Sequence, residues 1–199
     1  MTTKHAHPSI SSMQRISSAQ ILTALSVSVT FESGSILPSI FIPLPPSLPQ
    51  WPKPAADCAM AWYRMSGFIS DRTRMNLHGY PGILRDIYYA RSETDEAELC
   101  TESSTETTAI RVEMERERNA LRDALGEAGL DSVLKAVFDF DEFTAAAGAP
   151  DILVWAPDSS CWFFSEVKAP GDSLRRSQTD WLRRHSDVVH GHYVLTILE

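Results

Sequence analysis

Residues 148–184 of this 199-residue chain read GAPDILVWAPDSSCWFFSEVKAPGDSLRRSQTDWLRR, and this stretch decides the fold. Its first half holds two apolar, β-prone runs, 151–155 and 161–168, separated by the turn-like segment APDSS. Such runs predict two adjacent strands. The second half has apolar residues at helical spacing, which predicts a helix over 174–184.

The sequence on either side of this stretch adds a helix and a strand. Residues 110–130 are rich in helix formers and have a rough apolar stripe that ends near Gly126 or Gly129. Residues 192–198, HYVLTIL, predict a final strand. The order helix, strand, strand, helix, strand indicates the α/β class, with a small mixed sheet flanked by helices.

The residues upstream differ in composition from this unit. No acid occurs in residues 1–31, and seven of the twelve prolines fall between Pro38 and Pro54, which removes backbone donors. A run of six acids with many serines and threonines follows later. The predicted organisation is a disordered, Pro-rich N-terminal region (1–56), a short helical segment (57–91), an acidic Ser/Thr linker (92–109) and a single packed domain (110–199).

Charge and composition exclude several classes of protein. The formal net charge of −8 argues against a binder whose affinity for nucleic acid comes from overall charge. Cys58, Cys100 and Cys161 lack the spacing of a disulfide framework or a cysteine zinc site. The uncharged run 16–31 is shorter than the roughly 20 residues of a spanning helix. We therefore expect no membrane partner.

Two acids and a lysine stand out within the hairpin. Glu166 and Lys168 lie two residues apart on one strand and therefore share a face. If the hairpin brings Asp151 beside Glu166, the two carboxylates repel each other unless a cation lies between them. Oxygen ligands favour a hard ion such as Mg²⁺. The spacing alone is equally compatible with a solvent-facing ion pair and a turn-capping Asp151.

The segments GAPDILVW and SEVKAPGDSLRRSQTDWL together resemble the VRR-NUC branch of the PD-(D/E)XK nucleases. That family has a G-x-P-D-L-x-x-W strand, an E-V-K-x-P-x-D-x-L strand and turn, and a helix with Q-x-x-W. The resemblance covers 148–182 and is greatest to the C-terminal nuclease domain of the Fanconi-associated nucleases. It implies a restriction-endonuclease-like fold for residues 110–199.

The resemblance also implies roles for individual residues. Asp151 and Glu166, with the backbone carbonyl of Val167, would bind Mg²⁺ or Mn²⁺. Lys168 would activate the attacking water or orient the phosphate, and Gln178 would line the same site from the helix. The implied activity is metal-dependent hydrolysis of branched or flapped DNA by a structure-specific repair nuclease of the interstrand cross-link repair type. The implied location is the nucleus, with the mitochondrion as the alternative.

DNA contact needs a local basic patch, because residues 111–199 carry ten bases and sixteen acids. Arg175, Arg176 and Arg183 lie on the predicted helix beside the site, and we expect them to contact phosphates. A solvated helix face is the simpler alternative for such arginines. The sequence does not identify a protein partner.

One feature of the resembling family has no clear counterpart here. The family's site uses a further glutamate from a preceding helix; Glu113 and Glu115 are candidates, or the residue is absent. Its absence would make the chain a catalytically impaired DNA-binding remnant, which is the alternative function. A third hypothesis is an interaction module whose Pro-rich segment binds a partner.

Overall fold

The computed structural model describes residues 37–42, 54–73, 82–84, 87, 105–139 and 144–199. Within these residues five strands form one sheet in the order β1-β7-β6-β5-β2. They are β1 (Ser39–Ile42), β2 (Ile69–Arg72), β5 (Ile152–Trp155), β6 (Trp162–Lys168) and β7 (Tyr193–Leu198). β7 runs parallel to β6 and β1, whereas β5 is antiparallel to β6 and β2. The predicted mixed α/β sheet is confirmed.

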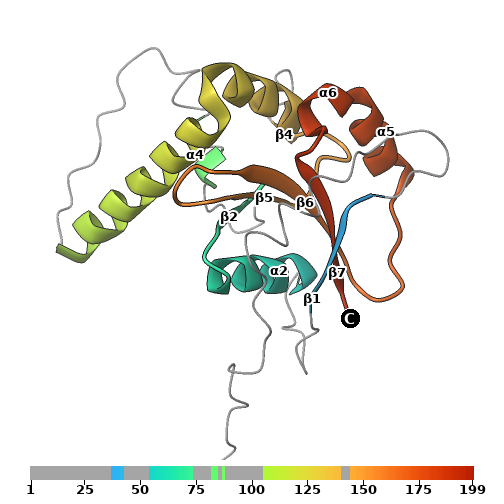
Figure 1. Ribbon diagram of the computed structural model, residues 1–199, viewed down its shortest axis with the longest axis horizontal. Helices are drawn as coiled ribbons and strands as arrows, with labels where there is room; N and C mark the ends of the chain where they lie inside the picture. Colours follow the sequence, from blue (N-terminus) through green and yellow to red (C-terminus); the bar gives the residue numbers. More distant parts are fainter. Residues whose placement is uncertain (1–36, 43–53, 74–81, 85–86, 88–104, 140–143) are drawn as a thin grey trace, which may run out of the picture.

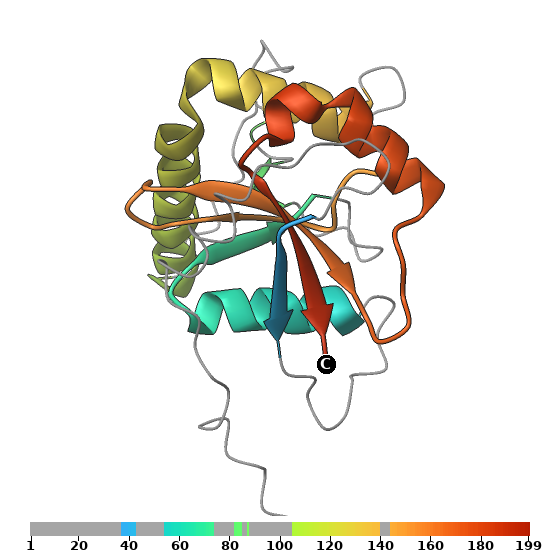
Figure 2. The ribbon, with the colours of Figure 1, turned by 45° about the vertical axis from the view of Figure 1, so that its right-hand side comes forward.

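Helices cover both faces of this sheet (Figures 1 and 2). Helix α2 (Pro54–Met65) lies on one face, and α4 (Thr105–Val137), α5 (Arg176–Arg184) and α6 (Ser186–Val189) lie on the other. Every residue of β5 and β6 is buried as a result. This explains why β5 and the first half of β6 are continuously apolar rather than alternating. A short pair, β3 (Phe138–Asp139) and β4 (Thr144–Ala145), adjoins the end of α4.

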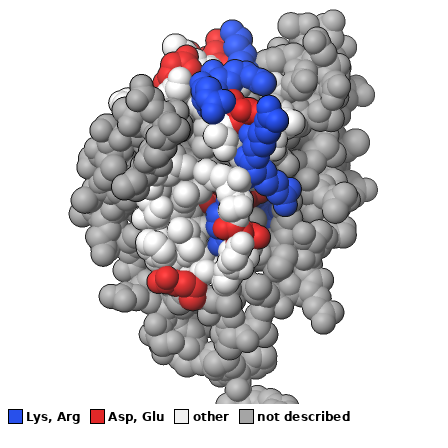
Figure 3. Space-filling view, turned by 90° about the vertical axis from the view of Figure 1, so that its right-hand side faces the viewer, with Lys and Arg blue, Asp and Glu red and all other residues white. Residues whose placement is uncertain are grey.

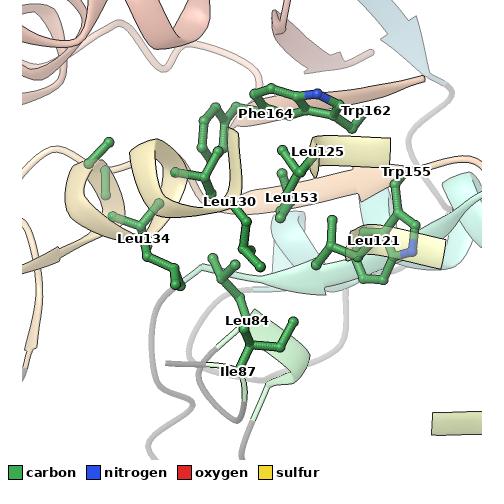
Figure 4. Close-up of a cluster of buried hydrophobic side chains, with 14 of the residues drawn as sticks. Leu84, Ile87, Leu121, Leu125, Leu130, Leu134, Leu153, Trp155, Trp162 and Phe164 are labelled. Atoms are coloured by element: carbon green, nitrogen blue, oxygen red, sulfur yellow. The ribbon is translucent and has the colours of Figure 1, made fainter. Parts of the chain in front are cut away.

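The two faces hold separate hydrophobic clusters. On the α4 face, leucines of the helix pack against Leu153, Trp155, Trp162 and Phe164 (Figure 4). On the α2 face, the strand residues between these positions pack against the helix: Ile152, Val154, Phe163, Val167 and Val194. The apolar residues of the two hairpin runs, the 174–184 helix and the last strand contribute buried side chains to these clusters: Val154, Trp155, Phe163, Phe164, Val167, Trp181 and Val194.

Helix α4 bends sharply at Gly126, whose φ of 64° lies outside the helical region. The sequence predicts a helix end near this glycine; the chain instead turns there and continues helically to Val137. Each half of the helix accepts an indole hydrogen bond. Trp155 Nε1 donates to the Glu117 carbonyl at 3.1 Å, and Trp181 Nε1 donates to the Ala136 carbonyl at 2.8 Å. The bend therefore lets one helix cover β5 and also reach α5.

The sheet also takes strands from upstream of residue 110. β1 is an edge strand within the segment expected to be disordered, and β2 lies within the segment expected to be helical. The segment 110–199 therefore supplies three of the five strands in the described part of the chain. Residues 105–109 of the expected linker belong to α4. Residues 1–36 and 92–104 lie outside the described residues. No described helix has the length and apolar character of a membrane span.

Candidate functional site

The hairpin register brings the two acids together. Ile152 pairs with Ser165 across β5 and β6, so the next position along each strand places Asp151 opposite Glu166. Both residues are on the face that carries Leu153 and Phe164, toward α4 and α5. Asp151 Oδ2 also accepts a hydrogen bond from the Val167 N–H at 3.2 Å. The register thus places the two acids side by side, which the sequence left as a condition.

Glu166 is 1% exposed and is held by one of its two carboxylate oxygens. Its Oε1 accepts a hydrogen bond from Lys168 Nζ at 2.7 Å and another from Gln178 Nε2. Its Oε2 is buried with no hydrogen-bond partner. Burial, together with the negative charge of Asp151, raises the pKa of Glu166 to about 7. The site is thus short of positive charge beside Oε2.

Gln178 links the helix to both charged residues. It occupies the third position of α5, and its Oε1 accepts hydrogen bonds from Lys168 Nζ and from the Arg175 N–H, both at 2.9 Å. The second bond satisfies one of the free donors at the helix start. Gln178 therefore holds Glu166 and Lys168 in place while it anchors the N-terminus of α5.

The loop before Asp151 packs so closely against α5 that position 148 must be glycine. A Cβ on Gly148 would lie 2.0 Å from the Ser177 carbonyl oxygen, and its φ is +90°. Only glycine allows the loop backbone to pack so closely against the start of α5. Directly after β2, the Thr73 N–H donates to the Asp151 carbonyl at 3.2 Å. The loop that presents Asp151 is therefore held from both sides.

Thr73 and Tyr193 are neighbours of the site that sequence reasoning missed. Tyr193 on β7 stands opposite Phe164, and its side chain is buried. Burial raises its pKa well above the usual value, and the negative charges of Glu166 and Asp151 add to this effect. The β-prone run that contains Ile69 could have indicated β2 and hence Thr73. No local signal marks Tyr193, because its position depends on the β6–β7 register.

The arginines expected to bind DNA are exposed on α5, and two of them are paired. Arg176 Nε lies 3.7 Å from Asp180, and Arg183 Nη1 lies 3.0 Å from the same carboxylate. The side chain of Arg175 is exposed at the N-terminal end of the helix. Figure 3, which views the molecule from the right-hand side of Figure 1, shows a group of basic side chains in its upper part. Asp180 offsets part of their charge but leaves the patch positive.

Glu113 and Glu115 do not reach the carboxylate pair. Glu115 lies beside Pro157 and Ser159 in a shallow surface pocket at the hairpin end of β5, which is the opposite end from Asp151. Both glutamates pair with arginines of their own helix, at 4.0 Å and 2.9 Å. Within the described residues no group of three His, Cys, Asp or Glu could hold a metal ion. The further glutamate of the family is thus not Glu113 or Glu115.

The residues present fit a hard divalent cation in chemical terms. Two carboxylates face each other, and the buried Oε2 of Glu166 lacks a partner. Such an oxygen costs free energy unless a cation or a donor satisfies it. Lys168 binds the other oxygen, so an ion at Oε2 would not displace the lysine. Asp151, Glu166 and the Val167 carbonyl are the groups that could hold the ion.

A crystal structure described as paFAN1 bound to 5′-flap DNA with a 2-nucleotide flap and a gap is similar to this chain at 14% identity, with a TM-score of 0.43. The similarity covers 99% of this chain and 39% of that one, so this chain spans well under half of that protein's length. No curated protein matches the chain. The family model for the VRR-NUC domain matches residues 90–189, which is half of the sequence and includes the whole hairpin site. The chain belongs to the VRR-NUC domain family.

Proposed function

We propose that this protein is a Mg²⁺- or Mn²⁺-dependent nuclease that hydrolyses phosphodiester bonds in branched or flapped DNA. The observation that carries the proposal is the opposed pair Asp151 and Glu166, with an unpartnered buried oxygen on Glu166 and the Lys168 amine bound to the other oxygen. Membership of the VRR-NUC family supports the same reaction class. A role in repair of interstrand cross-links, in the nucleus, belongs to the same proposal.

Each residue of the site has a separate task in this mechanism. Asp151, Glu166 and the Val167 carbonyl would hold the metal ion. When bound, the ion supplies a more acidic water and a positive charge beside the phosphate. Lys168, fixed by Glu166 and Gln178, points its amine at the water or at a phosphate oxygen. Gln178 keeps this amine in place, because its own amide is anchored at the start of α5.

The exposed arginines of α5 hold the DNA backbone in this proposal. Arg175, Arg176 and Arg183 lie on or at the start of the helix that carries Gln178, and Gln178 contacts Glu166. A DNA backbone bound along this helix would therefore pass the carboxylate pair. The protein as a whole is acidic, at −8, and repels DNA elsewhere. Binding would therefore be local and sensitive to salt.

The second candidate is a catalytically impaired DNA-binding remnant. It is favoured because, among the described residues, no group of three His, Cys, Asp or Glu side chains is placed to hold a metal ion. Two carboxylates bind one divalent ion more weakly than three do, because each lost oxygen ligand weakens coordination. The remnant would bind flapped DNA through the same arginines without cutting it.

A cleavage assay on a labelled 5′-flap duplex, with Mg²⁺ and separately with Mn²⁺, tests the two candidates. We expect metal-dependent cleavage by the wild type, and a loss of about 10²-fold or more in Lys168→Ala. Lys135→Ala, which changes an exposed lysine on α4, is the matched control and should cut normally. Retained DNA binding with no cleavage under either metal would contradict the nuclease and support the remnant.

A further inference from the structure

A row of side chains leads across the sheet from the candidate site to its edge. Lys168 on β6 pairs with Ile197 on β7, and Ile197 pairs with Phe41 on β1. Paired residues of neighbouring strands project from the same face of a sheet. Adjacent strands lie about 4.8 Å apart, so the backbone of Phe41 is about 10 Å from that of Lys168. All three residues lie near the carboxyl ends of parallel strands.

Burial decreases steadily along this row. Lys168 is 8% exposed, Ile197 is half-buried and Phe41 is 56% exposed. The neighbours Ile40 and Ile42 are buried on the opposite face, against the α2 cluster, which fixes Phe41 on the face of the site. Within the described residues only Phe41 and Val112 are exposed large hydrophobic side chains. The row is therefore a shallow apolar ledge that ends in an exposed aromatic ring.

From this arrangement we propose that Phe41 is a stacking platform for an unpaired base of the DNA strand whose phosphate lies at Lys168. The proposal rests on the proposed function for the direction in which the strand runs. An exposed ring can stack on any base, because every base has an aromatic face. The ledge is close enough to the site for a base next to the bound phosphate to cover the ring.

The local charge favours a base over a phosphate at this position. Glu199 follows directly after β7, is exposed, and donates its backbone N–H to the Ile42 carbonyl at 3.0 Å. Glu199 stands two residues past Ile197 on β7, the middle strand of the row, so its negative charge lies beside the ledge and disfavours a second phosphate there. The cationic contacts are at Lys168 and at the start of α5. The ledge thus accommodates a strand with its backbone over the site and a base over Phe41.

A two-by-two binding experiment tests the stacking. The proteins are the wild type and Phe41→Ala; the ligands are a fluorescent 5′-flap DNA and versions in which one unpaired nucleotide at a time is abasic. Binding is measured by anisotropy with Ca²⁺, so that hydrolysis is not needed. We expect Phe41→Ala to bind the intact flap about 5-fold or more weakly. At one abasic position the two proteins should bind equally, because the contact is already lost.

Further variants separate stacking from folding and from general hydrophobicity. Phe41→Trp keeps an aromatic face and should keep the preference for the intact base, and it remains informative if Phe41→Ala fails to fold. Val112→Ala removes the other exposed hydrophobic side chain, on α4, and should bind every DNA as the wild type does. Far-UV circular dichroism of each variant reports the fold.

Two outcomes would overturn the proposal. One is an equal effect of Phe41→Ala on the intact flap and on every abasic version, including no effect at all. The other is a wild-type dimer that Phe41→Ala dissociates with no such coupling, which would assign the ring to contact between two copies. Coupling without cleavage under Mg²⁺ or Mn²⁺ would refute hydrolysis and leave the stacking intact. Cleavage without coupling would refute only the stacking.

Discussion

At Glu166 two physical effects act in the same direction. Burial removes water from the carboxylate and Asp151 adds a second negative charge, so its pKa rises to about 7. One lysine and one amide bind Oε1, and Oε2 keeps no partner. In the proposed function, a divalent ion would offset both the repulsion between the two carboxylates and the burial of the unpartnered Oε2. Because Glu166 and Lys168 are buried, they are not a solvent-facing ion pair.

Removal of one carboxylate should weaken metal binding strongly. We expect Asp151→Ala to lower the affinity for Mn²⁺ by about tenfold or more, because a direct ligand is lost. Isothermal titration calorimetry of the folded variant measures this. Asp187→Ala, which changes an exposed acid on α6, should bind Mn²⁺ as the wild type does. Unchanged affinity in Asp151→Ala would exclude this residue as a ligand.

Asp71 on β2 should make stability depend on pH. Burial raises its pKa from 3.8 to about 6, although backbone N–H groups of Arg72, Leu84 and Ile83 oppose the rise. Between these values the folded protein binds more protons than the unfolded chain, so the free energy of unfolding falls as pH rises. The difference between the two pKa values of Asp71 corresponds to a loss of about 3 kcal/mol in the free energy of unfolding. Above about pH 6 this loss is complete.

The variant Asp71→Asn tests this dependence. An asparagine oxygen can accept the same N–H bonds but does not titrate between pH 4 and 7. Urea unfolding at pH 4.5 and 7.5 should show a smaller drop for the variant than for the wild type. The comparison cancels the contribution of the other titrating groups. Parallel curves for the two proteins would contradict the raised pKa.

At the scale of elements, the loop before β5 and the start of α5 act as one unit. Gly148 packs on the Ser177 carbonyl, and the next helical residue, Gln178, holds Glu166 and Lys168. A side chain at position 148 would push α5 away from the sheet. The geometry of the site therefore depends on a backbone contact between two elements.

Gly148→Ala should destabilise the protein more than Gly67→Ala does, although the two glycines have the same φ. Gly67 also has a φ of +90°, but a Cβ there meets nothing within 4 Å. Gly67→Ala should therefore cost only the backbone strain, about 1–2 kcal/mol. Gly148→Ala adds a steric clash, and its midpoint of thermal unfolding should fall further. Equal losses in the two variants would show that the close contact does not matter.

At the scale of the whole molecule, the core extends beyond the C-terminal segment. The α2 cluster contains Ile40 and Ile42 of β1 and Trp62 and Tyr63 of α2. Helix α2 packs on this face of β5, β6 and β7, and β1 extends the same face at the sheet edge. The segment 110–199 alone would expose that apolar face to water.

A fragment of residues 110–199 should therefore fail to fold cooperatively. We expect a broad thermal transition and strong binding of the dye ANS, because Val154, Phe163 and Val194 lose their cover. The full chain should unfold in a single sharp transition and bind little dye. A sharp transition for the fragment would restore the boundary that the sequence predicts at residue 110.

The sequence by itself determined the local parts of this protein. The alternation in CWFFSEVK places Glu166 and Lys168 on one face, whereas the position of Asp151 beside Glu166 follows from the β5–β6 register in the structure. The spacing of Gln178 and Trp181 predicts the helix that closes the site. These features depend on residues close in the chain, where side-chain periodicity follows from backbone geometry. The same motifs carried the resemblance to the VRR-NUC family.

Only the tertiary structure decided which distant segments complete the molecule. β1 and β2 are four residues long, too short for a clear pattern, and each joins the sheet by pairing with a strand far away in sequence. The unpartnered oxygen of Glu166, the exposure of Phe41 and the remote position of Glu115 follow from that assembly. The burial of a side chain and the register between distant strands depend on contacts between residues far apart in the chain, so no local stretch of sequence encodes them.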